Sequence, residues 1–309
     1  MEPDHSANIK AFMDKYKDAK IVSTQMAFNM MKAYFNTDFS ERKIVVKEDD
    51  TLNLGKHELK FIMAPFVHWP EVMFTYDNYD KVLFSADAFG KFGANDKIDP
   101  EGWACEARRY YFGIVGKFGQ NVQNVLKKLE GLEIKTICSL HGPVLNEDLD
   151  YYLNIYNIWS SYQSEASAVT IAYTSVYGNT KEAVLFLKEK LEEKNIEVAL
   201  HDLARDDMPE ALESAFENDR LVLATTTYNG GMFPTMETFI NELRGHNYQN
   251  RKIAFIENGS WAPSAIKAMK SSLEGLKDIT FLNSNVTIKG SLKDENIEQI
   301  NKLVQELSE

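Results

Sequence analysis

Cysteine is scarce in this sequence, and long apolar runs are missing from it. Only two of the 309 residues are cysteines, Cys105 and Cys138, and they form no CxxC pair. This argues against a disulfide-rich scaffold and against a rubredoxin-type iron site within the chain, because both need several closely spaced thiols. Glu2 and Asp4 stand where a secretory signal would carry basic residues, and no run of about 18 apolar residues suits a membrane. We therefore expect a soluble, cytoplasmic protein.

Basic side chains are also outnumbered. The sequence has 34 lysines and arginines against 46 aspartates and glutamates, which gives a formal net charge of −12. An acidic surface repels nucleic acid and anionic lipid headgroups, so we expect neither as a partner. Ordinary solubility is the main interpretation of this charge, and attraction of a basic electron-transfer partner is the alternative.

The sequence from residue 168 onward alternates short apolar runs with amphipathic runs. The latter include 181–194 and 294–307, whose apolar residues recur on one helical face. Such alternation predicts βα units in a parallel, doubly wound sheet with helices on both faces, which binds ligands at the carboxyl ends of its strands. The strand-like runs are 168–173, 196–200, 220–225, 252–256 and 279–288.

Residues 1–158 have a less regular pattern, which predicts a mixed α+β domain. Two short strands, 42–47 and 52–54, flank the acidic turn 48–50 and suggest a hairpin. The segment 159–167 is rich in Ser and Tyr and lacks apolar periodicity, so we expect a linker there and a second domain at 168–309. The other predicted elements are helices at 9–20, 27–35 and 106–129 and strands at 57–63 and 81–85.

Carboxylates and imidazoles occur in positions that suggest a metal site. Taken singly, a His after a strand is usually a turn residue, and an Asp there is usually a helix N-cap. Together they offer three imidazoles and three carboxylates without a thiolate, a set that suits iron, manganese or zinc. A carboxylate has two oxygens, so Asp87 is able to bridge two metals. The candidate ligands are Glu2, Asp4, His5, His68, Asp87 and His141.

Three loops in the second half have the composition of a flavin site. The first separates a strand pattern from a helix pattern, where backbone N–H groups and the helix N-terminus hold a phosphate. Glycines in the second allow the backbone to approach a flat ligand, and the third offers an indole ring. The candidates are Ser175, Val176, Tyr177, Gly178, Asn179 and Thr180; then, after Thr226, Thr227, Tyr228, Asn229, Gly230 and Gly231; and finally Asn258, Gly259, Ser260 and Trp261.

Four short segments together resemble the ligand segments of flavodiiron proteins. They are Glu2-Pro3-Asp4-His5, Phe66-Val67-His68-Trp69-Pro70, Phe84-Ser85-Ala86-Asp87-Ala88-Phe89-Gly90 and Ser139-Leu140-His141-Gly142-Pro143. The run Ser175-Val176-Tyr177-Gly178-Asn179-Thr180 is similar to a flavodoxin phosphate loop. The resemblance implies an α/β chain in which a partial metallo-β-lactamase-like αββα sandwich at 1–158 precedes a flavodoxin-like domain at 168–309.

The resemblance also implies cofactors and roles. Glu2 and His68 would bind one iron, Asp4, His5 and His141 the other, and Asp87 would bridge them, with FMN in the second domain. The family has a further histidine two residues before Glu2 and strands before that, so we expect that the chain starts at an internal methionine.

The implied activity is reduction of dioxygen to water or of nitric oxide to nitrous oxide. Electrons would come from a rubredoxin-like donor, and the resemblance implies a head-to-tail homodimer. Two alternatives stay open: an FMN electron carrier with a disabled metal domain, and a zinc-dependent metallo-β-lactamase-like hydrolase. Glu2, at a position where such hydrolases usually carry histidine, argues against the hydrolase.

Overall fold

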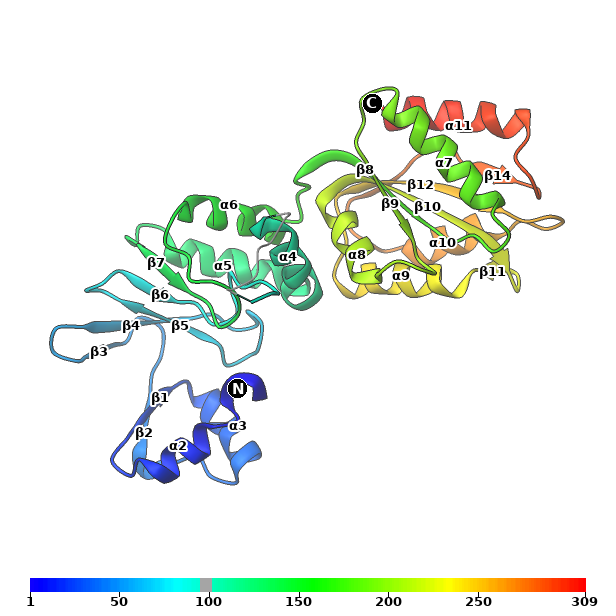
Figure 1. The fold of residues 1–309 in the computed structure, drawn as a ribbon. Coiled ribbons are helices and arrows are strands. Elements are labelled where there is room, and N and C mark those ends of the chain that lie inside the picture. The colour runs from blue at the N-terminus through cyan, green and yellow to red at the C-terminus, as the bar shows by residue number, and fades with distance from the viewer. Residues whose placement is uncertain (95–101) are drawn as a thin grey trace. The chain divides into compact units, whose positions relative to one another are not determined.

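The computed structural model describes residues 1–94 and 102–309, which divide into two compact units, Met1–Ser161 and Tyr162–Glu309. Each unit has a sheet of its own (Figure 1). The expected linker 159–167 includes the end of helix α6 (Leu149–Ser160) and the start of strand β8 (Ala166–Tyr173). Secondary structure reaches into this segment because Trp159 is fully buried among other aromatic rings of the first unit.

The first unit begins with a small helical layer. It comprises α1 (Pro3–Ser6), α2 (Ile9–Lys15) and α3 (Gln25–Phe35) beside the parallel pair β1 (Ile21–Ser23) and β2 (Lys43–Val45). Met13, Phe28 and Met31 form its apolar core. The helix expected at 9–20 ends at Lys15, because the Arg42 guanidinium donates hydrogen bonds to the free carbonyls there.

A five-stranded sheet forms the centre of the first unit. Its strands run antiparallel in the order β3-β4-β5-β6, and β7 joins β6 in parallel. Three helices cover one face of this sheet (Figure 1). The strands are β3 (Thr51–Asn53), β4 (Glu58–Met63), β5 (Met73–Asp77), β6 (Val82–Phe84) and β7 (Thr136–Cys138), and the helices are α4 (Trp103–Tyr110), α5 (Gly119–Leu129) and α6.

Two predictions for the first unit are wrong. The strands predicted at 42–47 and 52–54 do not form a hairpin: β2 pairs with β1, and β3 pairs with β4. The Asp50 carboxylate accepts a hydrogen bond from the Lys47 N–H, and this turn carries the chain from one sheet to the next. The helix predicted at 106–129 is interrupted by a π turn (Tyr111–Val115) and a 3₁₀ turn (Gly116–Phe118), where glycines weaken the α-helix.

The second unit is a mainly parallel sheet with the strand order β13-β12-β10-β8-β9. Strand β14 also pairs with β12, and the short β11 pairs antiparallel with β10. The strands are β8, β9 (Val198–Asp202), β10 (Asn218–Tyr228), β11 (Gly231–Met232), β12 (Arg251–Asn258), β13 (Ile279–Phe281) and β14 (Val286–Ile288). The helices are α7 (Asn179–Glu192), α8 (Met208–Glu217), α9 (Pro234–Gly245), α10 (Ala265–Leu273) and α11 (Asp294–Leu307).

The run 279–288, expected as one strand, forms two. Strand β13 pairs with the beginning of β12 and β14 with its end. Between them the backbone N–H groups of Asn283 and Ser284 turn away from the sheet and donate to the Glu306 carboxylate, each at 2.8 Å. A side chain from the last helix therefore holds the break in this edge of the sheet.

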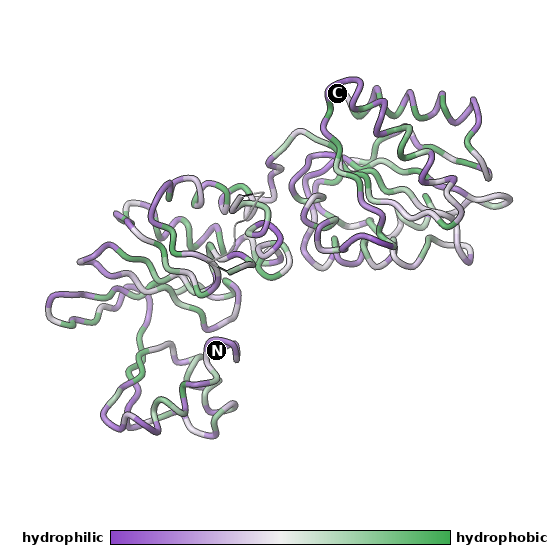
Figure 2. The backbone as a smooth tube through the Cα atoms, viewed as in Figure 1, coloured by the Kyte–Doolittle hydropathy of each residue, from purple (hydrophilic) through white to green (hydrophobic). Residues whose placement is uncertain are grey.

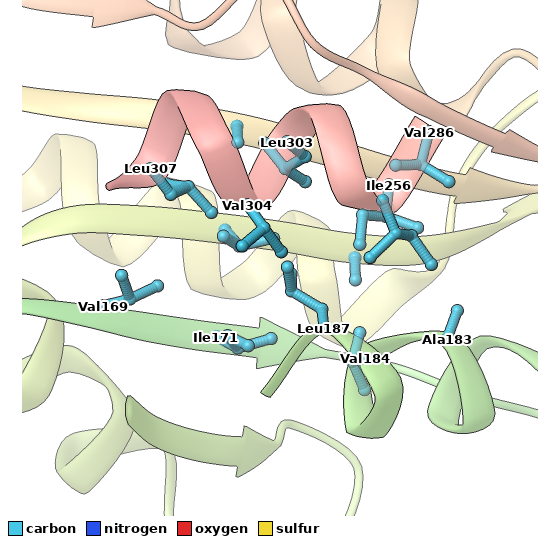
Figure 3. Packing of buried hydrophobic residues seen from close by; sticks show 14 of the residues in the cluster. Val169, Ile171, Ala183, Val184, Leu187, Ile256, Val286, Leu303, Val304 and Leu307 are labelled. Carbon is cyan, nitrogen blue, oxygen red and sulfur yellow. The ribbon is translucent and has the colours of Figure 1, made fainter. Parts of the chain in front are cut away.

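Aliphatic side chains fill the core of the second unit on the side of α7 and α11. Figure 3 shows Val169 and Ile171 of β8 facing Leu187 of α7, with Leu303 and Leu307 of α11 close by. All five are fully buried. The central strands are correspondingly apolar along most of their length, while the outer faces of the helices are hydrophilic (Figure 2). Burial of such side chains stabilises a fold by about 1.5–3 kcal/mol each, so this core fixes the strand ends that carry the loops described below.

Candidate functional site

The six candidate ligands reach one place from four segments of the first unit. Glu2, Asp4 and His5 belong to α1 or its N-cap, and His68 lies in the loop between β4 and β5. Asp87 follows β6, and His141 follows β7. These two strands are parallel neighbours, so their carboxyl ends deliver Asp87 and His141 side by side.

The segment that carries Glu2, Asp4 and His5 is one helical turn. Pro3 stands at its first position, and the Glu2 carbonyl accepts hydrogen bonds from the N–H groups of His5 (3.1 Å) and Ser6 (3.0 Å). Proline suits this position because its φ is already helical and no N–H is needed there. Glu2 precedes the turn, whereas Asp4 and His5 project from it.

Asp87 is the common member of two groups of ligand atoms. Its Oδ1 lies 3.0 Å from His5 Nε2 and 3.6 Å from His141 Nε2, and its Oδ2 lies 3.7 Å from His68 Nε2. Asp4 Oδ2 is 3.4 Å from His5 Nε2 and 3.3 Å from His141 Nε2. Glu2 Oε2 is 3.1 Å from His68 Nε2. Asp87 Oδ1 therefore faces His5 and His141, and Oδ2 faces His68.

These separations suit metal coordination. Nitrogen and oxygen ligands at about 2.1 Å from one tetrahedral ion lie about 3.4 Å from each other, which is close to most of the distances above. Ligand atoms of Asp4, His5 and His141 lie within 4.8 Å of one another, as do those of Glu2, His5 and Asp87. The residues present therefore fit two metal ions that share the Asp87 carboxylate.

Burial adds an electrostatic reason for cations at this place. The Asp87 side chain is only 5% exposed, and the side chains of His68 and His5 are 14% and 19% exposed. A buried carboxylate is costly unless a positive partner or several hydrogen bonds compensate for it. Metal ions between Asp87 and the imidazoles would supply that compensation.

Tyr110 also lies at the cluster. It is 2% exposed, and its ring centroid is 5.6 Å from that of His141. Burial, and after it the negative charge of Asp87, raises the pKa of Tyr110, and its hydroxyl is hydrogen-bonded to the Asp87 side chain. From the sequence alone, the run Arg108-Arg109-Tyr110-Tyr111 suits either the site or a helix surface. Tyr110 and Tyr111 are both buried, so the surface alternative does not hold for them.

Two glycines allow the Asp87 and His141 loops to approach closely. A Cβ atom at Gly90 would lie 2.9 Å from the Asp87 carbonyl oxygen and 3.1 Å from that of His141. At Gly142, where φ is +84°, a Cβ atom would lie 2.9 Å from Lys91 Cγ. The loops are also joined by a hydrogen bond from the Leu140 N–H to the Ala86 carbonyl, at 2.8 Å.

The second unit contains a cavity of about 530 Å³ at the carboxyl ends of β8, β10 and β12. Residues of all three predicted loops line it, but Gly178 and Gly231 do not. Gly178 precedes α7 with φ at +94°, and Gly231 belongs to β11. Phe233, Ala262 and Gly290 also line the cavity, although the sequence analysis did not predict them. Gly290 could have been predicted, because a glycine just after the apolar run 279–288 indicates a loop at the end of a strand.

The donors around this cavity fit a phosphorylated, flat ligand. Thr180 Oγ1 and Thr226 Oγ1 are buried and have no hydrogen-bond partner. Thr180 stands in the first turn of α7, whose N-terminal N–H groups favour an anion. Ser175 Oγ accepts hydrogen bonds from the N–H groups of Gly178 and Lys181, both at 3.2 Å, which shapes the loop for a phosphate.

Two aromatic side chains that line the cavity are almost fully exposed to solvent. Tyr177 is 91% exposed and Trp261 is 92% exposed, although both line the cavity. Gly259 allows the Trp261 loop to fold tightly, because a Cβ atom there would lie 2.8 Å from Pro263 Cα and 3.0 Å from Thr227 Oγ1. Large exposed rings at a concave site are typical of surfaces that stack on a ligand or a partner.

Two family models match the chain in the order of its two units. An ODP family beta lactamase model matches residues 1–142, and a flavodoxin domain model matches residues 170–290. This pair of domains, in this order, is the one expected from the resemblance to flavodiiron proteins. The expected order of a metallo-β-lactamase-like domain and a flavodoxin-like domain is confirmed.

Relatives whose names describe an activity are similar over most of this chain. A nitric oxide reductase of Moorella thermoacetica is 28% identical over 99% of this chain and 78% of its own length. An anaerobic nitric oxide reductase flavorubredoxin of Salmonella arizonae is 28% identical over 88% of this chain, which spans 59% of that protein.

Solved structures of flavodiiron proteins have the same fold. The rubredoxin oxygen:oxidoreductase of Desulfovibrio gigas superposes with a TM-score of 0.89 at 22% identity, over 99% of this chain and 78% of that one. The flavodiiron protein of Giardia intestinalis gives a TM-score of 0.84 at 25% identity, over 98% of this chain and 76% of that one. Within residues 1–94 and 102–309, no helix has the length and apolar character needed to cross a membrane.

Proposed function

We propose that this flavodiiron protein transfers electrons from a rubredoxin-like donor through FMN to a diiron site that reduces dioxygen to water or nitric oxide to nitrous oxide. The observation that carries the proposal is the division of the Asp87 oxygens between two groups of ligands. Its relatives include a nitric oxide reductase and a flavorubredoxin, which support both the substrate class and the donor.

The first unit would hold the irons. Glu2 and His68 would bind one, Asp4, His5 and His141 the other, and Asp87 would bridge them. When bound, the iron pair supplies electrons to the substrate and accepts its oxygen atoms as a Lewis acid. Tyr110 keeps its hydroxyl proton at neutral pH, since burial raises its pKa, and so it stays a hydrogen-bond donor beside Asp87.

The second unit would hold FMN. The N–H groups at the start of α7, with Thr180 and Ser175, would bind the phosphate, and the loops that follow β10 and β12 would enclose the isoalloxazine. When bound, FMN exchanges electrons with the donor and with the metal site. The protein's part is to orient the ring, and the exposed Trp261 would limit the access of water to one side of it.

A head-to-tail homodimer is part of the proposal. Tyr177 and Trp261 are almost fully exposed in the single chain, and a second copy would cover them. The 309 residues contain no CxxC pair, so a rubredoxin-like iron would lie outside them. We also propose a location in the reducing cytoplasm, because only two of the 309 residues are cysteines and they form no CxxC pair.

The test combines composition with turnover. The purified chain should contain close to two irons and one FMN, and it should consume nitric oxide or dioxygen when it receives electrons from a reduced rubredoxin. His141→Ala should lower iron content and turnover while FMN binding stays unchanged. A chain that binds FMN stoichiometrically but no iron would instead be an electron carrier, and hydrolytic activity of the zinc-loaded chain would favour the hydrolase.

A further inference from the structure

Aromatic side chains of the first unit form a continuous path that leads away from the metal cluster. In the second unit, the core beside α7 and α11 is largely aliphatic. Tyr173 is the only aromatic residue among the buried residues described in that core. In the first unit, by contrast, Tyr110, Tyr111, Tyr156 and Trp159 are all at most 2% exposed. Burial of tyrosine hydroxyls costs free energy that phenylalanine would not, so a packing role alone does not explain this composition.

The inner end of the path lies at the predicted metal ligands. Tyr110 contacts the His141 ring and is hydrogen-bonded to Asp87. Tyr156 lies close enough to Tyr110 for the two hydroxyls to interact electrostatically, and its ring centroid is 4.6 Å from that of Phe89, two residues beyond Asp87. Two oxidisable phenols therefore stand next to the bridging carboxylate.

The path continues through ring contacts to the surface. Tyr156 and Tyr111 have centroids 5.1 Å apart, and Tyr111 and Trp159 5.3 Å. Trp159 then stacks on Trp103 at 6.0 Å with an interplanar angle of 7°. Trp103 lies 6.3 Å from Tyr151, which is 45% exposed.

We infer that Tyr110, Tyr156, Tyr111, Trp159, Trp103 and Tyr151 form an aromatic relay that carries oxidising equivalents from the metal site to the protein surface. The inference rests on the proposed function, because dioxygen reduction supplies the oxidant whenever electrons from FMN arrive too late. Tyrosine and tryptophan are the aromatic side chains that are most easily oxidised. Electron tunnelling slows steeply with distance, so several short steps between neighbouring aromatic side chains permit rapid transfer where one long step does not.

The relay leaves its inner members unchanged. One electron moves inward at each step, so every inner ring regains the electron that it gives up and keeps its hydrogen atoms. The net loss is at Tyr151, which gives one electron to the relay and its phenolic proton to water. A soluble thiol then returns a hydrogen atom to the Tyr151 phenoxyl group and is itself oxidised. The metal site thus receives the missing electron without damage to its ligands.

The test measures where a protein radical forms, and it does not depend on the rate of turnover. The iron-loaded, FMN-containing chain is reduced, freed of excess reductant and mixed with dioxygen in the presence of a nitroso or nitrone spin trap. Peptide mass spectrometry then locates the trapped radical, while optical spectra follow iron oxidation. We expect the adduct at Tyr151, its loss in Trp103→Phe and in Tyr151→Phe, and an unchanged adduct in Tyr34→Phe. Tyr34 is a matched control, since it is 50% exposed and lies in α3, outside the relay.

The outcomes separate this inference from the proposed function. Iron that dioxygen does not oxidise would refute the proposed function, and the relay would lose its oxidant with it. Iron that is oxidised without an adduct at Tyr151 would overturn the relay alone, as would an adduct that persists in Trp103→Phe. Thermal unfolding and FMN content of each variant show whether the fold is intact, and Tyr151→Phe changes only an exposed hydroxyl, so its result does not depend on refolding of the core.

Discussion

Asp87 is the side chain that joins the two halves of the proposed metal site. We predict that Asp87→Asn lowers iron content toward zero, because the amide loses the charge and one of the two bridging oxygens. Changes outside the ligand sphere already lower metal affinity by about 10–100-fold, and loss of a ligand should exceed that. Metal analysis of the purified variant measures the effect.

The matched control for Asp87→Asn is Asp14→Asn. Asp14 is exposed on α2 and pairs with Lys10, so its replacement should leave iron content unchanged. Full iron occupancy in Asp87→Asn would show that the carboxylate does not bridge the metals.

Gly90 sets the separation between the Asp87 and His141 loops. In Gly90→Ala the new methyl group would meet two backbone oxygens, which cannot rotate away as a side chain would. We predict a loss of about 1–3 kcal/mol in stability, as is typical of overpacking, together with reduced iron content. Gly113→Ala is the control, because a Cβ atom there meets nothing within 4 Å. Equal stability and iron content in the two variants would contradict this role of Gly90.

At the residue scale, the sequence predicted the ligand candidates but not their surroundings. Asp87 and His141 follow apolar runs, so their position at strand ends could be foreseen. Tyr110 could not be assigned, because its place depends on how α4 packs over the sheet. The role of Gly90 depends on the approach of two loops about 50 residues apart, which no local pattern encodes.

At the element scale, the break between β13 and β14 depends on Glu306 of α11. Burial acts to raise the pKa of this carboxyl, but hydrogen bonds from Asn283 and Ser284 outweigh it, and the net pKa is lowered. A folded-state pKa below the unfolded value contributes stability above the unfolded pKa, and that stability is lost as the pH falls through the folded pKa. The contribution should therefore be complete at neutral pH.

We predict that Glu306→Gln lowers the free energy of unfolding by about 1 kcal/mol at pH 7, because one charged acceptor of two backbone N–H groups is lost. The difference from the unmodified chain should shrink as the pH falls below about 4. Urea titrations at pH 7 and pH 3.5 measure it. A difference that is the same at both pH values would mean that the carboxylate charge does not matter.

Periodicity predicted the elements of the second unit better than those of the first. The run 294–307 coincides with α11, since its apolar residues recur over almost four helical turns. The region 106–129 shows the same kind of pattern, yet Gly113, Gly116 and Gly119 interrupt the helix. The false hairpin has a similar cause: the acidic turn was recognised, but the partner of each strand is set by contacts distant in sequence.

At the scale of the whole molecule, each unit has its own sheet and core. We predict that residues 162–309 alone fold and bind FMN stoichiometrically, because all residues that line the flavin cavity belong to this unit. Flavin absorbance of the purified fragment and its cooperative unfolding measure this. A fragment that is unfolded, or folded without flavin, would show that the first unit is needed for FMN binding.

The order of the two domains followed from the sequence alone, because two kinds of pattern meet near residue 160. The boundary itself was harder to predict. Trp159 and Ser160 look like linker residues in a polar, aromatic stretch, but they complete α6 and are buried. Such burial depends on Trp103 and Tyr111, which lie far away in the sequence.

The candidate ligands come from two separate parts of the first unit, so metal binding would affect the stability of that unit. Three candidate ligands come from the α1 segment, and the other three come from loops of the five-stranded sheet. Bound ions would therefore link the helical layer to the sheet, and their binding free energy would increase the free energy of unfolding of the first unit. Without bound iron, the helical layer formed by about the first 45 residues would be less stable. Limited proteolysis would then cleave this layer in the iron-free protein, and it would reveal the loss of iron without an activity assay.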